Sequence, residues 1–224
     1  MEFTVERQPD HAPVVHLTFD VDEPATAVVD ALSLADNVDG DPLIWVHGTT
    51  DERRMILTSR GLTSNRTLHQ MRLRLPAAPT DLETSAFTAE DINQFVAVNN
   101  RAFSWHPEQS GLTAQAVRAD MAQPWFDADG FRLHHIDGDL AGFCWTKVHT
   151  EPEPLGEIYV IAVDPEFHGR GLGKALTLAG LQWLAEHGLK TGMLYVESDN
   201  VSAVATYERI GFDVHRVDTL WGRG

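Results

Sequence analysis

The sequence contains one cysteine, few basic residues and no long apolar run. Cys144 is the single cysteine among 224 residues, so no internal disulfide can form. Lys and Arg number 17 against 33 Asp and Glu, and the formal net charge is −16. Nucleic acids and anionic membranes favour basic patches, so we expect neither as a partner. No stretch could span a bilayer and the N-terminus does not resemble a signal peptide, so we expect a cytoplasmic protein.

Metal-ligand patterns are also missing. His134, His135 and His149 have no metal-ligand spacing with cysteine or carboxylates, so we expect no metal. Cys144 stands between Phe143 and Trp145 in an apolar segment, and we interpret it as a core residue rather than a nucleophile. With 43% hydrophobic residues the chain can bury a core, and its length suits one large domain or two small ones.

A glycine-rich turn between an apolar strand and a helix is the most informative stretch. Ile158 to Val163 predicts a buried strand, His168-Gly169-Arg170-Gly171-Leu172-Gly173-Lys174 follows, and 175–184 has helical spacing. Glycines allow a tight turn, and the first N–H groups of a helix have no internal partners, so this arrangement suits a phosphate. Arg170 and Lys174 add positive charge. From these residues alone, a glycine turn without a ligand remains the alternative.

The remaining sequence predicts an α/β fold with a mixed sheet. The segment Pro76-Ala77-Ala78-Pro79-Thr80-Asp81 is the best linker, so we expect domains at 1–76 and 82–224 joined by 77–81. Periodicity and turn residues predict strands at 14–19, 43–46, 68–75, 131–136, 140–148, 193–196 and 212–217, and helices at 25–34, 50–60, 88–103, 113–121 and 201–210.

An internal repeat links the two ends of the chain. When Leu194-Tyr195-Val196 is placed over Ile44-Trp45-Val46, Gly211-Phe212 falls on Gly61-Leu62 without a gap. The N-terminal copy has no glycine loop, and the acidic segment 20–23 would repel a pyrophosphate. We therefore interpret residues 1–76 as a partial, degenerate copy with a structural role. Any strand–helix–strand unit could align this well by chance, and that alternative stays open.

Two motifs resemble those of the GNAT acetyltransferases. Residues 168–173 resemble the acyl-CoA loop, Gln/Arg-x-x-Gly-x-Gly/Ala, with His168 at the first position. Residues 200–212 resemble the second signature, Asn-x-x-Ala-x-x-x-Tyr-x-x-x-Gly-Phe, in which Asn200, Ala203 and Tyr207 share one helix face. A plain N-cap and a core tyrosine are the alternatives. The resemblance implies the GNAT fold, a mixed central sheet with helices on both faces, here preceded by the partial N-terminal copy.

Further segments resemble the mycothiol synthase family, a tandem GNAT family of actinobacteria. The match is dense from about residue 81 to 220, at 98–103, 106–109, 145–149, 156–160 and 194–200, and weak before it. It implies acetylation of the cysteinyl amine of Cys-GlcN-Ins by acetyl-CoA, the last step to mycothiol. The family's N-terminal domain has its own glycine loop, whereas this chain has only the rear portion of such a domain.

The resemblance also implies roles for individual residues. Glu108, Lys147, Glu157 and Tyr195 would contact the thiol pseudo-disaccharide. Glu157 would act as general base and Tyr207 as general acid. A carboxylate at the start of a strand can take a proton from an amine, and the alternative is a solvated strand-end glutamate, which is common. The residues implied for acetyl-CoA are Ile161, Ala162, Val163, His168, Gly169, Arg170, Gly171, Leu172, Gly173, Lys174, Asn200, Val201, Ser202, Ala203, Val204 and Ala205.

Two other functions remain open at this stage. One is a GNAT enzyme that acetylates a protein N-terminus or another small amine. The other is a non-catalytic acyl-CoA-binding regulator. Binding alone needs neither Glu157 nor Tyr207, so the presence of both favours an enzyme. A peptide would need an open groove, which we expect the His106-Pro107-Glu108 segment to close, and we expect a monomer.

Overall fold

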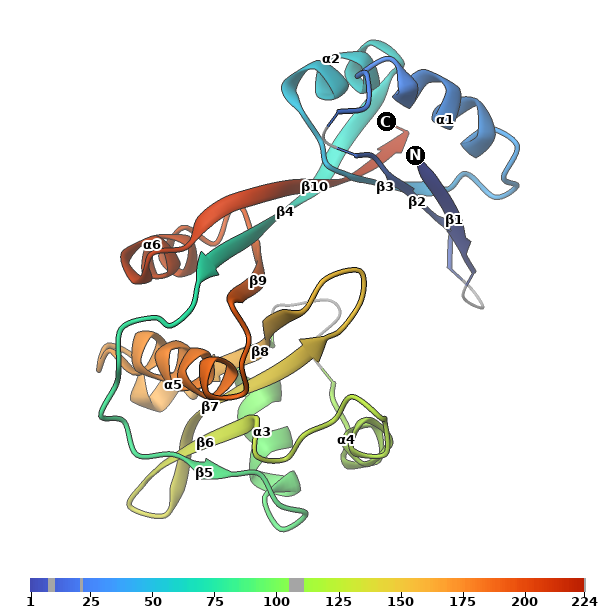
Figure 1. Ribbon diagram of the computed structural model, residues 1–224. Coiled ribbons are helices and arrows are strands. Elements are labelled where there is room, and N and C mark those ends of the chain that lie inside the picture. The colour runs from blue at the N-terminus through green and yellow to red at the C-terminus, as the bar shows by residue number, and fades with distance from the viewer. Residues whose placement is uncertain (8–10, 21, 105–110, 224) are drawn as a thin grey trace. The chain divides into compact units, whose positions relative to one another are not determined.

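The computed structural model describes residues 1–223 except 8–10, 21 and 105–110, and the chain forms two compact units (Figure 1). Unit 1 contains Met1–Met71, Tyr195–Val201 and Val214–Gly224. Unit 2 contains Arg72–Leu194 and Ser202–Asp213. Neither unit is one continuous segment, because the chain returns to unit 1 after it has built most of unit 2.

Unit 1 is a five-strand sheet with two helices. Its strand order is β1-β2-β3-β10-β4, in which β2 and β3 are parallel while β1 and β10 run antiparallel to their neighbours β2 and β3. The last three residues of β4 and the first of β10 belong to unit 2. The elements are β1 (Glu2–Glu6), β2 (Val14–Thr18), α1 (Ala27–Ala35), β3 (Leu43–His47), α2 (Asp51–Ser59), β4 (Leu62–Arg74) and β10 (Asp213–Arg223).

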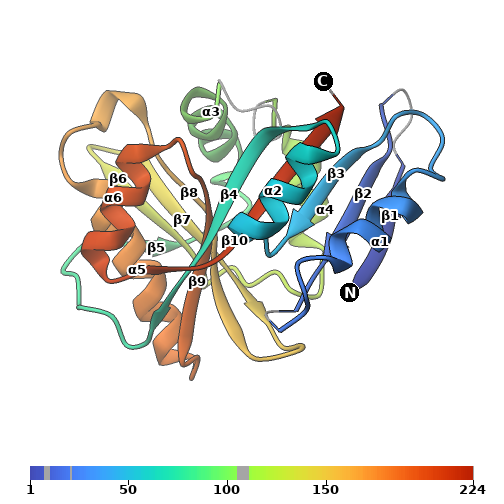
Figure 2. The same ribbon diagram turned by 90° about the horizontal axis from the view of Figure 1, so that it is seen from above.

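The core of unit 1 follows the alternation of its strands. Val15 and Leu17 of β2 and Ile44 and Val46 of β3 are buried, and they pack in one cluster with apolar residues of α1 and α2. Both helices lie on the same face of β2 and β3 (Figure 2). Helix α2 begins as its sequence predicts, because the Thr50 side chain accepts a hydrogen bond from the backbone N–H of Arg53.

Unit 2 carries strands in the order β9-β8-β7-β6-β5, and of β9 it contains residues 191–194. Strand β7 is antiparallel to both of its neighbours, β6 and β8, whereas β8 and β9 are parallel. The elements are β5 (Ser85–Ala86), α3 (Ile92–Ala102), α4 (Ala114–Met121), β6 (Phe131–Ile136), β7 (Asp139–His149), β8 (Leu155–Val163), a 3₁₀ turn (Pro165–Phe167), α5 (Leu172–Glu186), β9 (Thr191–Glu197) and α6 (Val201–Ile210).

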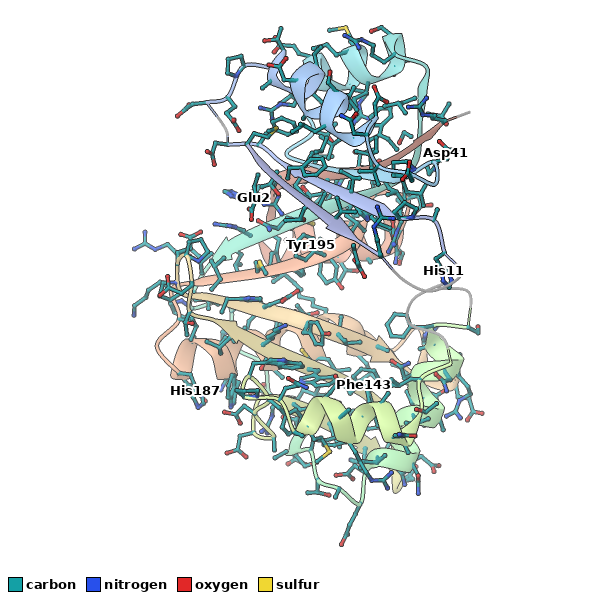
Figure 3. The ribbon with its side chains drawn as sticks, turned by 90° about the vertical axis from the view of Figure 1, so that its right-hand side faces the viewer. Glu2, His11, Asp41, Phe143, His187 and Tyr195 are labelled. Atoms are coloured by element: carbon teal, nitrogen blue, oxygen red, sulfur yellow. The ribbon has the colours of Figure 1, made fainter. Side chains whose placement is uncertain are left out.

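Helices cover both faces of the sheet in unit 2 (Figure 1). On the α5 face the backbones approach closely, since a Cβ added at Gly180 would lie 2.5 Å from the Cys144 sulfur. On the opposite face, the rings of Phe143 and Phe95 of α3 meet edge to face with centroids 4.8 Å apart (Figure 3). The predicted α/β class, with a mixed sheet and helices on both faces, is confirmed.

The differences from the sequence-based expectation concern exposed segments. Strands β1 and β5 were not predicted, because β1 is almost wholly exposed and β5 has only two residues. Helix α3 begins at Ile92, later than the capping pattern at 88–91 suggested. Strand β4 begins earlier than the expected strand at 68–75, and its Gln70 is buried and donates to the Tyr195 hydroxyl.

Candidate active site

A β-bulge interrupts β8 in the middle of unit 2. Trp145 of β7 pairs with Val160 and the next residue, Thr146, pairs with Ile158, so Tyr159 is the extra residue. Among the described residues, the parallel ladder between β8 and β9 ends at Ile158 and Leu194, although β8 continues to Val163. A bulge bends its strand and increases the local twist. The outer half of β8, which includes Ile161 to Val163, therefore extends beyond the described β8–β9 ladder.

The turn after β8 is held from both ends. His168 Nε2 donates to the Val163 carbonyl over 3.0 Å, and Asp164 accepts the backbone N–H of Glu166 over 3.1 Å. Arg101 of α3 pairs with Asp164. Burial alone would raise the pKa of Asp164, but the hydrogen bonds from Arg101 and Glu166 outweigh it and lower the pKa. Asp164 is therefore an ionised anchor for the turn.

Three glycines follow that anchor, and the protein itself requires only two of them. Gly169 and Gly171 have φ of 78° and 76°, the left-handed region that side chains rarely adopt. Gly173 has neither a positive φ nor a heavy atom within 4 Å of an added Cβ. The protein alone would thus accept a side chain at Gly173, and its own packing does not require the glycine.

Helix α5 begins at this turn without a side chain on its first N–H groups. Gly171 is the N-cap and provides no side-chain hydrogen bond. Arg170 and Lys174 are both exposed beside it. A helix start with free N–H donors and two nearby cations is suited to a polyphosphate group.

Tyr207 is the one residue of α6 that is buried. Burial, and to a lesser extent the nearby Cys144 thiol, raises the pKa of the Tyr207 phenol well above its ordinary value. The phenol is therefore protonated over the whole physiological range and can act as an acid. Cys144 lies on the α5 face of the sheet, so Tyr207 belongs to that face as well.

Glu157 lies on the other face of β8. A Cβ added at the preceding Gly156 would meet Leu184 of α5 at 2.7 Å, and successive residues of a strand point to opposite faces. Glu157 is 8% exposed, and its Oε2 accepts a hydrogen bond of 2.7 Å from His149 Nε2. Its partner across the β7–β8 ladder is Lys147. The candidate base and the candidate acid thus reach β8 from opposite faces.

Aromatic rings hold the ammonium of Lys147. Its Nζ lies 4.4 Å from the centroid of Trp125 and 5.0 Å from that of Tyr159. Asp120 of α4 is close enough to interact with Lys147. Burial raises the pKa of Asp120, and the charge of Lys147 lowers it by a smaller amount. Burial, followed by the charges of Asp120 and Glu157, also raises the pKa of Tyr159. Lys147 is thus fixed near Glu157 by cation–π contacts.

The sequence between α3 and α6 matches a known family. Residues 93–212 match the profile of the Acetyltransferase (GNAT) family. The chain belongs to the GNAT family. It is 44% identical over 188 residues to the mycothiol acetyltransferase of Mycobacteroides abscessus, covering 80% of this chain and 64% of that protein. It is 45% identical over 186 residues to the mycothiol acetyltransferase of Streptomyces griseus, covering 80% and 60%. The chain therefore spans about three fifths of the length of these relatives.

Solved GNAT structures share the fold. A GCN5-related N-acetyltransferase from Sphaerobacter thermophilus matches with a TM-score of 0.74 at 14% identity, over 98% of this chain and 75% of that one. A tandem GNAT protein from the clavulanic acid biosynthesis pathway matches with a TM-score of 0.63 at 17% identity, over 96% and 77%.

Not all predicted residues of this GNAT chain lie in unit 2. Tyr195, Asn200 and Val201 belong to unit 1, where the Tyr195 hydroxyl accepts hydrogen bonds from Gln70 at 2.7 Å and Arg216 at 3.1 Å. Glu108 lies outside the described residues. Ser202 to Ala205 form the first turns of α6 in unit 2, and only Ser202 among them is exposed.

The contacts of His149, Trp125 and Tyr159 were missed by sequence reasoning. His149 stands two residues after Lys147 in β7, so the period of a strand could have placed both on the face of Glu157. Tyr159 could not be singled out because the bulge is not visible in the apolar run. Trp125 comes from a connection between α4 and β6, and nothing in the sequence indicates its approach to Lys147.

Unit 1 has a cation where unit 2 has its glycine turn. In the segment before α1, the carbonyls of Asp20 and Glu23 accept hydrogen bonds from the Arg53 guanidinium at 3.3 and 2.9 Å. Arg53 is 2% exposed and also donates to the Gly48 carbonyl at 2.6 Å. The backbone N–H groups of Asp20 and Glu23 are also bonded within the protein, to the Glu23 carboxylate at 2.7 Å and to the Asp20 carbonyl at 3.2 Å.

Neither a metal-binding group nor a membrane-spanning helix is found among the described residues. In the described ranges, no three His, Cys, Asp or Glu residues gather so that they could hold a metal ion. Nor is any helix of the described residues both long and apolar enough to cross a bilayer.

Proposed function

We propose that this chain is an acetyl-CoA-dependent N-acetyltransferase that converts Cys-GlcN-Ins to mycothiol by acetylating its cysteinyl amine. The observation that best supports acetyl-CoA binding is Gly173, a position at which the protein itself would accept a side chain. The relatives named mycothiol acetyltransferase support the choice of acceptor, and so does the resemblance of residues 145–149 and 156–160 to that family.

Acetyl-CoA would lie along β8 and the turn that follows. The N–H groups of 168–174, with Arg170 and Lys174, would bind the pyrophosphate. Ile161 to Val163 would hydrogen-bond the acetyl end, since the ladder to β9 has ended before them. The start of α6, from Asn200 to Ala205, would contact the pantetheine.

The chemistry would be a direct transfer. Glu157 takes a proton from the amine, whose nitrogen then attacks the thioester carbonyl. Backbone N–H groups of Ile161 to Val163 stabilise the oxyanion of the tetrahedral intermediate. When that intermediate collapses, the C–S bond breaks and Tyr207 gives its proton to the leaving thiolate. Amine and thiol would approach the carbonyl from opposite faces of β8, which fits the placement of Glu157 and Tyr207.

The acceptor would be held by groups that match its hydroxyls. Lys147 donates hydrogen bonds, Glu108 accepts them and Tyr195 can do both. The clamp of Trp125 and Tyr159 supports a binding role for Lys147, because it fixes the ammonium in one place before a substrate arrives.

We further propose that catalysis belongs to the domain at 82–224, with 77–81 as a linker, and that residues 1–76 have a structural role. The internal hydrogen bonds of the Asp20 and Glu23 N–H groups support this, since a phosphate would need backbone donors of this kind.

The test is a panel of acceptors assayed for acetylated product by mass spectrometry. Cys-GlcN-Ins, cysteine, glucosamine and a peptide with a free N-terminus are each incubated with acetyl-CoA, with a zero-time blank for the substrate thiol. We expect Cys-GlcN-Ins to have a kcat/KM at least about 100-fold above the others, because its hydroxyls find matched partners. Faster acetylation of the peptide or of a simple amine would overturn the proposed acceptor.

A further inference from the structure

The contact between His149 and Glu157 has no role in the scheme above. It joins adjacent strands over 2.7 Å, from a half-buried imidazole to a carboxyl group that is 8% exposed. An ionised carboxylate has no proton to donate, so Nε2 of His149 carries the hydrogen and Glu157 accepts it. The bond occupies Oε2 and leaves Oε1 as the remaining oxygen of the carboxylate.

We propose that His149 is a positioning residue for Glu157: its Nε2–H donates to Oε2 of the buried carboxylate, fixes its orientation and directs Oε1 to the acceptor amine. This inference rests on the proposed role of Glu157 as the base. A buried carboxylate is disfavoured by desolvation unless hydrogen bonds stabilise its charge. Among the described hydrogen bonds of the Glu157 carboxyl group, that of His149 supplies this stabilisation.

Other charged groups also face Glu157 and must be held constant. Lys147 is its ladder partner on β7, and Tyr159 is two residues along β8. Asp120 of α4 acts on Lys147 and Tyr159. The α5 face contributes Leu184 behind Gly156 rather than a charge. Substitution of His149 leaves all of these in place, so a difference between variants measures the single hydrogen bond.

Three variants separate positioning from packing. His149→Leu removes the donor. His149→Gln keeps an N–H donor at the reach of Nε2, whereas His149→Asn has a shorter side chain whose amide does not reach Glu157. The matched control is His134→Leu on β6, since His134 also makes one hydrogen bond, to the Glu83 carbonyl at 2.8 Å, away from Glu157.

The first readout is the pH dependence of kcat/KM for acetyl transfer. In the Leu and Asn variants we expect the midpoint of the fall in kcat/KM at low pH to move up by about one pH unit. This is the effect of losing one hydrogen bond to a charged group. Well below the wild-type midpoint this corresponds to a loss of about tenfold beyond any loss at pH 8. The Gln variant should keep the wild-type midpoint of this fall. An equal loss of kcat/KM at every pH, or the same midpoint in all variants, would overturn the proposal.

The second readout needs no substrate. The side-chain carboxyl carbon of Glu157 is followed by NMR during a pH titration, with Glu157→Gln used to assign its signal. We expect a higher midpoint in the Leu and Asn variants than in the wild type, Gln and His134→Leu proteins. If the Leu protein does not fold, the Asn and Gln proteins decide the outcome. A chain that acetylates no acceptor but shows these midpoints would overturn the proposed function and leave the role of His149 intact.

Discussion

At the scale of single residues, Tyr207 is the most direct test of the transfer chemistry. Its phenol is buried in α6 with a raised pKa, and its ring packs against Phe212 at a centroid distance of 5.9 Å. Tyr207→Phe removes one oxygen and keeps this packing. We expect kcat to fall by about 10²–10³-fold, as when a general acid is lost, with little change in acetyl-CoA affinity. Stopped-flow rates and calorimetric binding measure both quantities, and an unchanged kcat would exclude Tyr207 as the acid.

Cys144 gives a second prediction at this scale. Burial raises the pKa of its thiol to about 12, so the thiolate is scarce at neutral pH. In the unfolded chain a thiol has a pKa of about 8.5. The buried thiol thus contributes stability in full below that pH, and the contribution is lost as the pH rises toward the folded pKa.

The measurement is the rate of disulfide exchange with an aromatic disulfide reagent at pH 8, before and after denaturation. We expect the native thiol to react at least about 100-fold more slowly than the unfolded one. Cys144→Ala should also flatten the fall in stability above pH 9. Rapid labelling of the native protein would contradict the burial of Cys144 and would reopen a covalent route.

At the scale of elements, two glycines of α5 separate packing from ligand binding. A Cβ at Gly180 would meet the Cys144 sulfur at 2.5 Å and Ile158 at 2.9 Å, whereas a Cβ at Gly173 would meet nothing. We expect Gly180→Ala to cost about 1–3 kcal/mol of unfolding free energy. Gly173→Ala should leave that free energy within about 0.5 kcal/mol of wild type.

Acetyl-CoA binding should respond in a different way. Gly173→Ala places a methyl group against the expected pyrophosphate, so we expect its affinity to fall on the order of tenfold, about 1.4 kcal/mol. Urea titration measures the unfolding free energy of both variants, and calorimetry measures their affinity for acetyl-CoA. Equal affinity of Gly173→Ala and wild type for acetyl-CoA would mean that the glycine-rich turn does not bind the pyrophosphate.

The elements also show what could be predicted from the sequence. Helix α6 was predicted at 201–210, as found, because a glycine ends it and its apolar spacing is regular. Strand β1 was missed since it is short and mostly exposed, and pairing with β2 together with the packing of Phe3 stabilises it. The bulge at Tyr159 depends on how β7 pairs with β8, a register that no local pattern specifies. The aromatic clamp on Lys147 could not be foreseen for the same reason.

At the scale of the whole molecule, charge bears on cofactor binding. The chain carries a formal charge of −16, which opposes the phosphates of CoA. We therefore expect binding to depend on the local donors at 168–174. At 100 times its Kd, acetyl-CoA should add about 2.7 kcal/mol to the unfolding free energy. For a chain of this size, that predicts a rise in Tm of about 5–10 °C.

Thermal unfolding monitored by circular dichroism measures this shift. Acetyl-pantetheine at the same concentration is the control, since it lacks the nucleotide phosphates and should have a much smaller effect. Equal shifts for both compounds would mean that the phosphate-binding role of the turn is wrong.

The central claim is direct acetylation of Cys-GlcN-Ins, and rapid-quench mass spectrometry tests it most directly. The full chain is mixed with acetyl-CoA and Cys-GlcN-Ins, and free CoA, N-acetylated product and intact protein are quantified in the same samples. We predict that product and CoA appear together, in equal amounts, with no acetylated protein beforehand. Absence of product above the blank, or an acetyl group on the protein before product appears, would contradict the account.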